Sequence, residues 1–422
     1  MTTFDVLYER LKELEVIDAH EHHRGSIECV ATDPVSFICT NYLGGVLNSL
    51  DMYAMQNISK SSDDQSRYLA LCDYWPMIKN TAHAKIVEGY FVQRGVNGGI
   101  IPENYEAIAY LCANRSPKWL KDAFKEHHIA ATITNVVGHV NLGGFTSIEQ
   151  FATGKLRFES GVHPIVGIDT LLQYSRAEEI ERVEALANMS VNSPQNLASA
   201  VCKIAEMCVQ NGAVGLKVLL AYTHGLEFAQ PTASLLNEDW SLLREWKSPV
   251  MPGRTLQSYL LRSLIQFAGE TGIPVAFHTG YLQSRASEQT NVKQLVNLFS
   301  EYPNVNFDVY HLSYPYYFDM LEAAKSYSNV YSNCCWTTAI DPAYTMRYLQ
   351  NVALSLPAAQ VIGFGADYIL YPELAVECLN HSLKIIAGAL APLVEQRFFS
   401  LQEAEELAAW WLSGTAKRLY HL

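Results

Sequence analysis

The feature that most constrains this chain is a series of eight short apolar runs, each rich in β-branched residues and each ending in polar residues or glycine. Near-continuous apolarity over about five residues is typical of a parallel strand that is buried on both faces. Helical patterns lie between the runs, as at 196–211, 256–271 and 315–327. Strands that alternate with helices indicate βαβ units and a parallel sheet. The eight runs are 15–23, 130–138, 163–169, 215–222, 273–280, 305–312, 329–336 and 361–368.

The number of runs predicts an α/β fold of the (β/α)8 TIM-barrel type. Such barrels often exceed about 250 residues as one unit, so we expect residues 1–422 to form a single barrel domain. The first and second runs are too far apart for a bare barrel, and residues 24–115 between them have helical patterns and loops. We expect this segment to be a helical insertion that covers the barrel mouth and contributes to an oligomer contact. Two further helices are expected at 372–396 and 401–420.

The composition narrows the possible partners. Lys and Arg total 30 against 43 Asp and Glu, a net charge of −13, and no basic stripe is present, which argues against a nucleic-acid partner. Only 17% of residues are charged, where about 25% is usual, so we expect a large core and a homo-oligomer. We find no leader pattern, no apolar run of the roughly 20 residues of a membrane span, and no CxxC spacing among nine cysteines. We therefore expect a cytoplasmic protein, without a membrane partner, that acts on a small molecule.

Titratable residues gather where the runs end, which is where a barrel builds its active site. The first run ends in Asp18-Ala19-His20-Glu21-His22. Side chains alternate along a strand, so His20 and His22 should point to the same side and make a natural pair of metal ligands. A single HxH pair is a weak signal, and two histidines with unrelated roles give the same pattern.

Three other runs strengthen this interpretation. The fifth run ends in His278 and Thr279, the sixth in His311, and the eighth in Asp367. Imidazoles with one hard oxygen ligand suit Zn²⁺, Mn²⁺ or another first-row divalent ion. We found no GxxxxGK loop, HExxH helix, GxSxG elbow or dinucleotide fingerprint that would indicate other chemistry.

The fourth run carries Lys217 within otherwise apolar residues. An unpaired buried ammonium is costly, so a partner must compensate the charge or the side chain must be modified. A carbamylated Lys217 would supply an anionic oxygen bridge between two metal ions. A lysine that is paired with a carboxylate, or that reaches a substrate anion, fits the sequence equally well.

Together, His20-x-His22, Lys217, His278, His311 and Asp367 resemble, in this order, the metal-dependent amidohydrolase superfamily. The chain is most similar to its amidohydrolase 2 branch, which includes uronate isomerases, aromatic-acid decarboxylases and the amidohydrolase domain of nodulin/glutamine-synthetase-like fusion proteins. The segments 215–228, 311–336, 363–373 and 410–422 carry the match, whereas 24–115 carries little of it.

The resemblance implies one or two divalent ions, most often zinc. The HxH pair and Asp367 would bind one ion, and His278 would join them or bind a second. His311 would be a ligand or would orient the substrate, and a carbamylated Lys217 would mark the two-ion subtype. Asp367 is then expected to take a proton from a metal-activated water and pass it to a leaving group, while the metal or His311 polarises a substrate carbonyl.

Five further residues are candidates for substrate binding. Arg24 follows the HxH pair and could hold a substrate carboxylate through two hydrogen bonds, although a surface ion pair fits it as well. The other four follow strand ends, where they either line the site or cap the core: Tyr222, His224, Tyr314 and Trp336.

The sequence thus favours a metal-dependent hydrolase that acts on a C–N or C–O bond of a small, carboxylate-bearing substrate. A decarboxylase or a uronate-type isomerase on the same scaffold is the main alternative, because fold does not decide between these reactions. A non-catalytic binding module is the third, and six intact ligand candidates argue against it.

Overall fold

A computed structural model of the chain describes residues 1–24, 29–39, 42–174, 177–245, 254–282 and 287–422. The part of the predicted insertion at 25–28 and 40–41 lies outside the described residues. Eight strands form one sheet in which each strand is hydrogen-bonded to the next in chain order. The strands are β1 Val16–Glu21, β2 Ile129–Val137, β3 Val162–Gly167, β4 Leu216–Val218, β5 Val275–His278, β6 Phe307–Tyr310, β7 Val330–Asn333 and β8 Val361–Ile362.

The eight strands make a nearly closed (β/α)8 barrel, as the sequence predicted. The pairs from β3 to β7 are parallel, and the register places Lys217, Ala276 and Asp308 side by side in one row. At the closing edge the segment after β8 meets β1, because the backbone N–H of Ala19 donates to Phe364 and that of Asp367 donates to His20. All eight predicted runs contain a strand, and each strand overlaps its predicted range.

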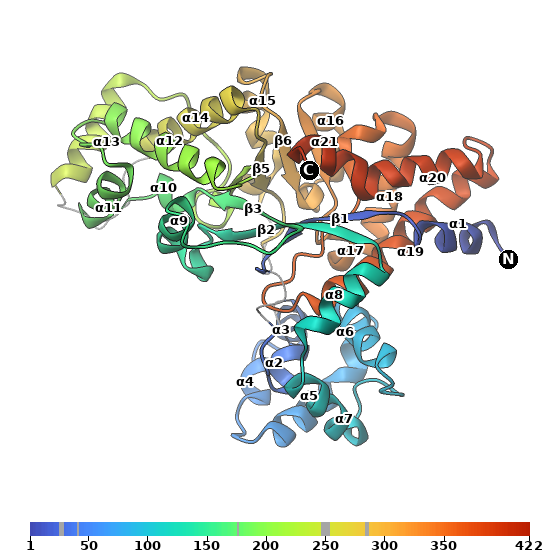
Figure 1. Ribbon diagram of the computed structural model, residues 1–422. Coiled ribbons are helices and arrows are strands. Elements are labelled where there is room, and N and C mark those ends of the chain that lie inside the picture. Colours follow the sequence, from blue (N-terminus) through green and yellow to red (C-terminus); the bar gives the residue numbers. More distant parts are fainter. Residues whose placement is uncertain (25–28, 40–41, 175–176, 246–253, 283–286) are drawn as a thin grey trace. The chain divides into compact units, whose positions relative to one another are not determined.

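The described residues divide into two compact units that interleave along the sequence. The first unit combines Met1–Thr132 with Cys334–Gly414, and the second combines Ile133–Leu282, Ala286–Asn333 and Thr415–Leu422, in each case without the residues excluded above. Figure 1 labels the helices of both units. Those of the first unit are α1 Thr3–Leu11, α2 Pro34–Ile38, α3 Leu43–Leu50, α4 Ala54–Ile58, α5 Asp64–Ile78, α6 Ala82–Gln93, α7 Tyr105–Ala113, α8 Pro117–Glu126, α17 Thr337–Ile340, α18 Pro342–Ser355, α19 Glu373–Glu395 and α20 Leu401–Ala409.

The second unit supplies the helices that follow β2 to β6, together with a last helix near the end of the chain. Within it, α12 packs against α14 and α11, as Figure 1 also shows. These helices are α9 Gly144–Ala152, α10 Asp169–Leu172, α11 Ala177–Ala187, α12 Pro194–Gln210, α13 Ala233–Glu245, α14 Arg254–Thr271, α15 Val296–Glu301, α16 Tyr317–Ser326 and α21 Thr415–Tyr420.

Local sequence signals set where the long helices begin. Ser193 accepts a hydrogen bond from the N–H of Asn196 at the start of α12, and Pro194 occupies the first helical position, where a missing N–H has no cost. Asp341 caps α18 in the same way, ahead of Pro342. These caps explain why α12 and α18 begin where they do.

Helix α19 fills the core of the first unit. It packs against α1, α6 and α18, and apolar residues cover most of its surface. Among the described helices it is the one that is long and apolar enough, by length and composition alone, to cross a membrane, and 78% of its most apolar window is buried inside the protein. A helix that is hydrophobic nearly all round is what the core of a large unit requires.

The predicted helix over 401–420 is interrupted, and β8 is shorter than its predicted run, for one shared reason. A π-helical segment, Trp410–Gly414, separates α20 from α21. The carbonyl of Trp411 accepts a hydrogen bond from the N–H of Gly363 at 2.7 Å, so Gly363 leaves the strand ladder directly after β8. Gly365 follows where a Cβ would lie 2.6 Å from that of Cys335, so the chain passes too close to its neighbours for any larger residue.

Candidate metal centre

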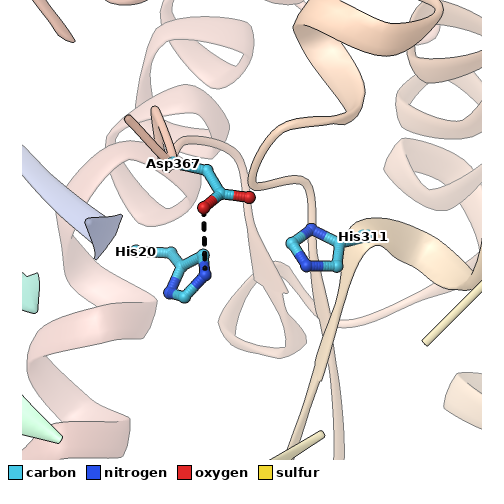
Figure 2. A group of neighbouring side chains, drawn as sticks. All are labelled: His20, His311 and Asp367. Carbon is cyan, nitrogen blue, oxygen red and sulfur yellow. Dashed lines mark ion pairs between the residues drawn. The ribbon is translucent and has the colours of Figure 1, made fainter. Parts of the chain in front are cut away.

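The first unit brings His20, His22 and Asp367 together. The Nε2 atoms of His20 and His22 lie 3.4 and 3.0 Å from the same oxygen, Oδ1 of Asp367. Figure 2 shows His20 and Asp367 facing each other across this ion pair. All three side chains are at least nine-tenths buried, with exposed fractions of 1%, 5% and 5%. The HxH pair therefore points to one side, as the strand alternation predicted, and it points at the predicted carboxylate.

Two buried carboxyls of β1 fix the backbone on either side of Asp367. Oδ1 of Asp18 accepts from the N–H of Ala366 at 3.1 Å, and Oε2 of Glu21 accepts from the N–H of Tyr368 at 3.1 Å. Between them the N–H of Asp367 donates to the carbonyl of His20 at 2.9 Å. Three successive peptide groups are thus tied to β1, and Asp367 is held at a φ of +63°, a left-handed conformation that few residues other than glycine adopt.

The pKa values of the same two carboxyls, Asp18 and Glu21, are raised. Burial raises the pKa of Asp18 to about 7, against the hydrogen bonds from Ala366 and His20 that lower it. Burial, followed by the negative charges of Asp18 and Asp367, raises the pKa of Glu21 well above its ordinary value. Carboxyl groups that are buried close together are stabilised by a cation nearby or by a proton that they share.

An aromatic cluster supports Asp367 from the inserted segment. The hydroxyl of Tyr42 donates to the backbone carbonyl of Asp367. The Tyr42 ring lies 4.7 Å from the ring of Trp336, 4.9 Å from that of His83 and 5.7 Å from that of Tyr368, measured between centroids. Burial lowers the pKa of His83 to about 3, so its imidazole is neutral. The backbone of Trp336 also has a left-handed φ, of +62°.

The second unit brings His278 and His311 together. Nε2 of His311 lies 2.9 Å from Nδ1 of His278, whose own Nε2 lies 3.0 Å from the carbonyl oxygen of Tyr281. A carbonyl only accepts, so Nε2 of His278 carries the hydrogen, and its Nδ1 accepts from Nε2–H of His311 when both rings are neutral. The lone pair of the neutral His311 ring is then on Nδ1.

The backbone around His311 is tightly constrained. His311, Leu312 and Ser313 all have left-handed φ values, of +68°, +49° and +52°. Oγ1 of Thr279 donates to the carbonyl of Tyr310 at 2.6 Å and accepts from the N–H of Ser313 at 3.0 Å, so it bridges both ends of this turn. Gly280 follows with a φ of +72°, at a position where a Cβ would meet the backbone of Tyr314.

Lys217 lies in the middle of β4 and is fully buried. Its Nζ lies 3.5 Å from the centroid of the Tyr310 ring, which is the geometry of a cation–π contact. The positive charge of Lys217 lowers the pKa of both Asp169 and Asp308, although burial is the larger effect and raises each of them to about 7. Partners for a cation are therefore close to this lysine within the second unit.

The substrate-binding candidates are placed differently from one another. The ring of Tyr222 lies 4.7 Å from the ring of His278, and 38% of Tyr222 is exposed. Trp336 is buried in the aromatic cluster, while Tyr314 is half-buried with its ring 6.0 Å from that of Tyr281. His224 and Arg24 are also half-buried, and the carbonyl of His224 accepts from Arg254 at 3.3 Å.

Three groups that hold Asp367 in place were not selected from the sequence: Asp18, Glu21 and Tyr42. Asp18 and Glu21 stand in the same short motif as the HxH pair, so two extra carboxyls in a buried run were an available signal. Tyr42 lies in a segment without a recognisable pattern, and nothing in the sequence relates it to Asp367.

His20, Asp367 and His311 are three of the buried side chains that each offer one atom of the kind that a metal ion binds. His20 and Asp367 belong to the first unit, and His311 belongs to the second. Imidazole nitrogens with a carboxylate oxygen are the donor set that Zn²⁺ and other first-row divalent ions take in catalytic sites. The residues present therefore fit a divalent ion.

Comparison with known proteins identifies related chains. The family model described as Amidohydrolase matches residues 170–422. The protein fluG of Emericella nidulans is 22% identical over 224 residues, which cover 50% of this chain and 26% of that protein, so the chain spans about a quarter of the length of this relative.

Two solved structures resemble the fold over nearly its whole length. Uronate isomerase of Thermotoga maritima superposes with a TM-score of 0.72 at 14% identity, covering 99% of this chain and 97% of that one. Uronate isomerase of Bacillus halodurans C-125 gives 0.71 at 15% identity, covering 99% and 96%. At such low identity the likeness concerns the barrel fold.

Proposed function

Because the chain belongs to the amidohydrolase family, we propose that it is a metal-dependent hydrolase that cleaves a C–N or C–O bond of a small, carboxylate-bearing substrate. The observation that carries this proposal is the convergence of His20 and His22 on one carboxylate oxygen of Asp367, in a buried place. Family membership and this donor set together support a divalent metal, and zinc is our proposal for its identity, with manganese as the alternative.

In this proposal His20, His22 and Asp367 of the first unit hold one ion, and His311 stays the further ligand that the sequence predicts. A divalent ion bound there would lower the pKa of a water molecule toward about 7 and so would supply a nucleophile at neutral pH. Asp367 would accept a proton from the attacking water and pass it to the leaving group, as a positioned general base and acid. The hydrogen bonds from Ala366, Asp367 and Tyr368 to β1 keep this carboxylate in place between the two imidazoles.

We propose that His278 acts through His311 and does not bind the first ion directly. Its two ring nitrogens already contact Tyr281 and His311, and the resulting tautomer leaves Nδ1 of His311 as the ligand atom. Histidine ligands are commonly oriented by a partner on the second ring nitrogen. A second metal ion, joined to the first through a carbamylated Lys217, stays a separate prediction. The mass of the intact protein tests whether Lys217 carries the carbamate.

For the substrate we propose that Arg24 binds its carboxylate. Tyr222, His224, Tyr314 and Trp336 would contact the rest of the molecule. Tyr222 has the strongest support, because its half-exposed ring lies against His278. The net charge of −13 makes local cations necessary for an anionic substrate, and Arg24 and the metal provide them.

A uronate-type isomerase is the second candidate. It is kept because the two uronate isomerase structures share the fold of nearly the whole chain at TM-scores above 0.7. A decarboxylase stays an alternative on the same scaffold, because the fold supports several reactions at the same strand ends.

The deciding experiment combines metal content with a substrate screen. Elemental analysis of the purified protein should find one divalent ion per chain. The loaded protein is then offered amides and esters of small carboxylic acids, uronates and aromatic acids. Hydrolysis of the first set supports the proposal, and turnover of uronates supports the isomerase. A chain that holds no metal and gains no activity with Zn²⁺ or Mn²⁺ would be a binding module.

We further propose a cytoplasmic homo-oligomer. The inserted segment exposes apolar side chains, including Leu50 at 47%, Met52 at 71% and Tyr53 at 53%, which are costly to leave in water. Light scattering on the purified chain measures the mass of the assembly, and a monomeric mass would contradict this part of the proposal.

A further inference from the structure

A buried polar network of the second unit connects the last helix of the chain to the strand that precedes His311. The Tyr420 hydroxyl donates to Oδ2 of Asp308 at 2.6 Å and lies 3.1 Å from the hydroxyl of Tyr310. Asn333 donates to the same oxygen of Asp308 at 3.1 Å. Each of these residues is at most 2% exposed, so the contacts are made in a place that excludes water.

The register of the sheet explains why these groups meet. Lys217, Ala276 and Asp308 lie in one row across β4, β5 and β6, and register partners in a parallel sheet face the same side. Tyr310 stands two residues beyond Asp308 and therefore faces that side as well. Its ring is covered by Nζ of Lys217 at 3.5 Å, while its hydroxyl meets Tyr420.

The Tyr310 side chain is consequently fixed at both its face and its tip, immediately before the backbone turns left-handed at His311. Thr279 already fixes the backbone of this turn through the carbonyl of Tyr310 and the N–H of Ser313. Thr279 contacts the backbone of Tyr310, whereas the Tyr420 hydroxyl contacts the tip of its side chain.

We propose that Tyr420 is a positioning residue, whose hydroxyl holds Tyr310 against Asp308 and thereby sets the direction of the His311 imidazole toward His278. Its consequence for metal affinity rests on the proposed function, whereas its consequence for the His278–His311 hydrogen bond does not.

The test removes one hydroxyl. Tyr420→Phe keeps the ring and loses both hydrogen bonds. In the metal-free protein, nitrogen NMR of the histidine rings should show the signals of His278 and His311 shifting or broadening. Titration with Zn²⁺ should show binding weakened about tenfold, the effect expected for loss of an outer partner of a ligand.

The matched control is Tyr68→Phe, because Tyr68 is fully buried and its hydroxyl donates to a backbone carbonyl, that of Ile101, at 2.9 Å. It should lower the melting temperature without moving either histidine readout. If Tyr420→Phe behaves like Tyr68→Phe in all three measurements, the hydroxyl only stabilises the fold and the proposal is wrong.

A second variant keeps the test decisive if Tyr420→Phe does not fold. Tyr310→Phe keeps the ring under Lys217 and breaks the link to Tyr420 from the other end, so it should reproduce the histidine shifts. If the unmodified chain binds no metal, the proposed function fails, and the NMR comparison still decides whether Tyr420 positions His311.

Discussion

Asp18 accepts hydrogen bonds from the backbone N–H groups of both His20 and Ala366, at 3.3 and 3.1 Å, and so joins the end of β1 that carries His20 and His22 to the residue before Asp367. The two partners are 346 residues apart in the sequence, as their numbers show. One buried carboxyl therefore holds both halves of the proposed ligand set of the first unit in register. The residues around the proposed ligands therefore hold these ligands in place, and their loss should be measurable.

Replacing Asp18 tests this directly. Asp18→Ala leaves two buried N–H groups without an acceptor and should lower the free energy of unfolding by about 2 to 4 kcal/mol. Asp18→Asn keeps one acceptor oxygen and should lose less. Urea unfolding followed by circular dichroism measures both variants. Equal losses in the two would show that the acceptor oxygen does not matter.

The hydroxyl of Tyr42 should influence the metal without touching it. Tyr42→Phe removes the hydrogen bond to the carbonyl of Asp367 and keeps the aromatic cluster. We expect a stability loss of about 1 kcal/mol and metal binding about tenfold weaker. Tyr74→Phe, in which the hydroxyl bound to Asp51 in the same inserted segment is lost, is the control and should leave metal affinity unchanged. Unaltered affinity in Tyr42→Phe would remove Tyr42 from the support of Asp367.

Asp367→Asn separates metal binding from proton transfer. The amide keeps an oxygen near His20 and His22 but accepts a proton poorly, so we expect part of the metal to be retained. Turnover of the substrate found by screening should fall by at least about 100-fold, the usual scale for loss of a general base. Elemental analysis and steady-state kinetics on the same preparation give both numbers. Normal turnover would exclude the proposed role of this carboxylate.

The ion pair of Arg115 and Glu373 should stabilise the segment that follows Asp367. Arg115 binds both carboxylate oxygens, at 2.6 and 2.8 Å, and donates to the carbonyl of Leu370 at 2.9 Å, with side-chain exposures of 3% and 1% for the pair. Arg115→Met strands a buried carboxylate and should cost about 3 to 5 kcal/mol. The double variant with Glu373→Met should recover much of that loss. A double variant no more stable than Arg115→Met would mean that the pair is not coupled.

Stability should depend on pH through Asp169, whose carboxylate accepts from the N–H of Leu219. Burial raises its pKa from 3.8 to about 7. The folded protein therefore binds more protons than the unfolded chain over this interval, so the contribution is complete below about pH 4 and is lost as pH rises through about 7. The loss is at most about 4 kcal/mol.

Asp169→Asn keeps an oxygen for Leu219 and removes the titration, so its unfolding free energy should fall less than that of the parent between about pH 4 and 7. Asp308 has a pKa raised in the same direction, so part of the slope should remain. Urea unfolding at several pH values measures both profiles. Parallel profiles would contradict the raised pKa of Asp169.

The barrel could be predicted from the sequence because a strand that is buried on both faces is a continuous apolar run. The sequence also predicted that His20, His22 and Asp367 would meet, since parallel strands bring their carboxyl ends to one side. It could not predict that β8 would end at Ile362, because this depends on the carbonyl of Trp411, in a π-helical segment distant in the sequence. Every residue has a backbone carbonyl, so the residue type at position 411 does not reveal that its carbonyl accepts a hydrogen bond.

Tyr42 and Tyr420 were not selected from the sequence either, because each hydroxyl donates to a group that is remote in the chain. A buried tyrosine is ordinarily read as packing. Lys217 was recognised as unusual, because a charge in an apolar run stands out, yet its contact with the ring of Tyr310 is one that no pattern of charges indicates.

The interleaving of the two units has a consequence for the order of synthesis. The first unit is complete only when Cys334–Gly414 has joined Met1–Thr132. The second unit is complete only when Thr415–Leu422 has been added. Until Cys334–Gly414 has been added, β1 lacks the segment after β8 that closes the sheet, and the apolar residues at this edge stay available to other chains. Folding to completion is therefore deferred until almost all of the described chain has emerged, and we expect this protein to rely on chaperones more than one whose units follow each other along the sequence.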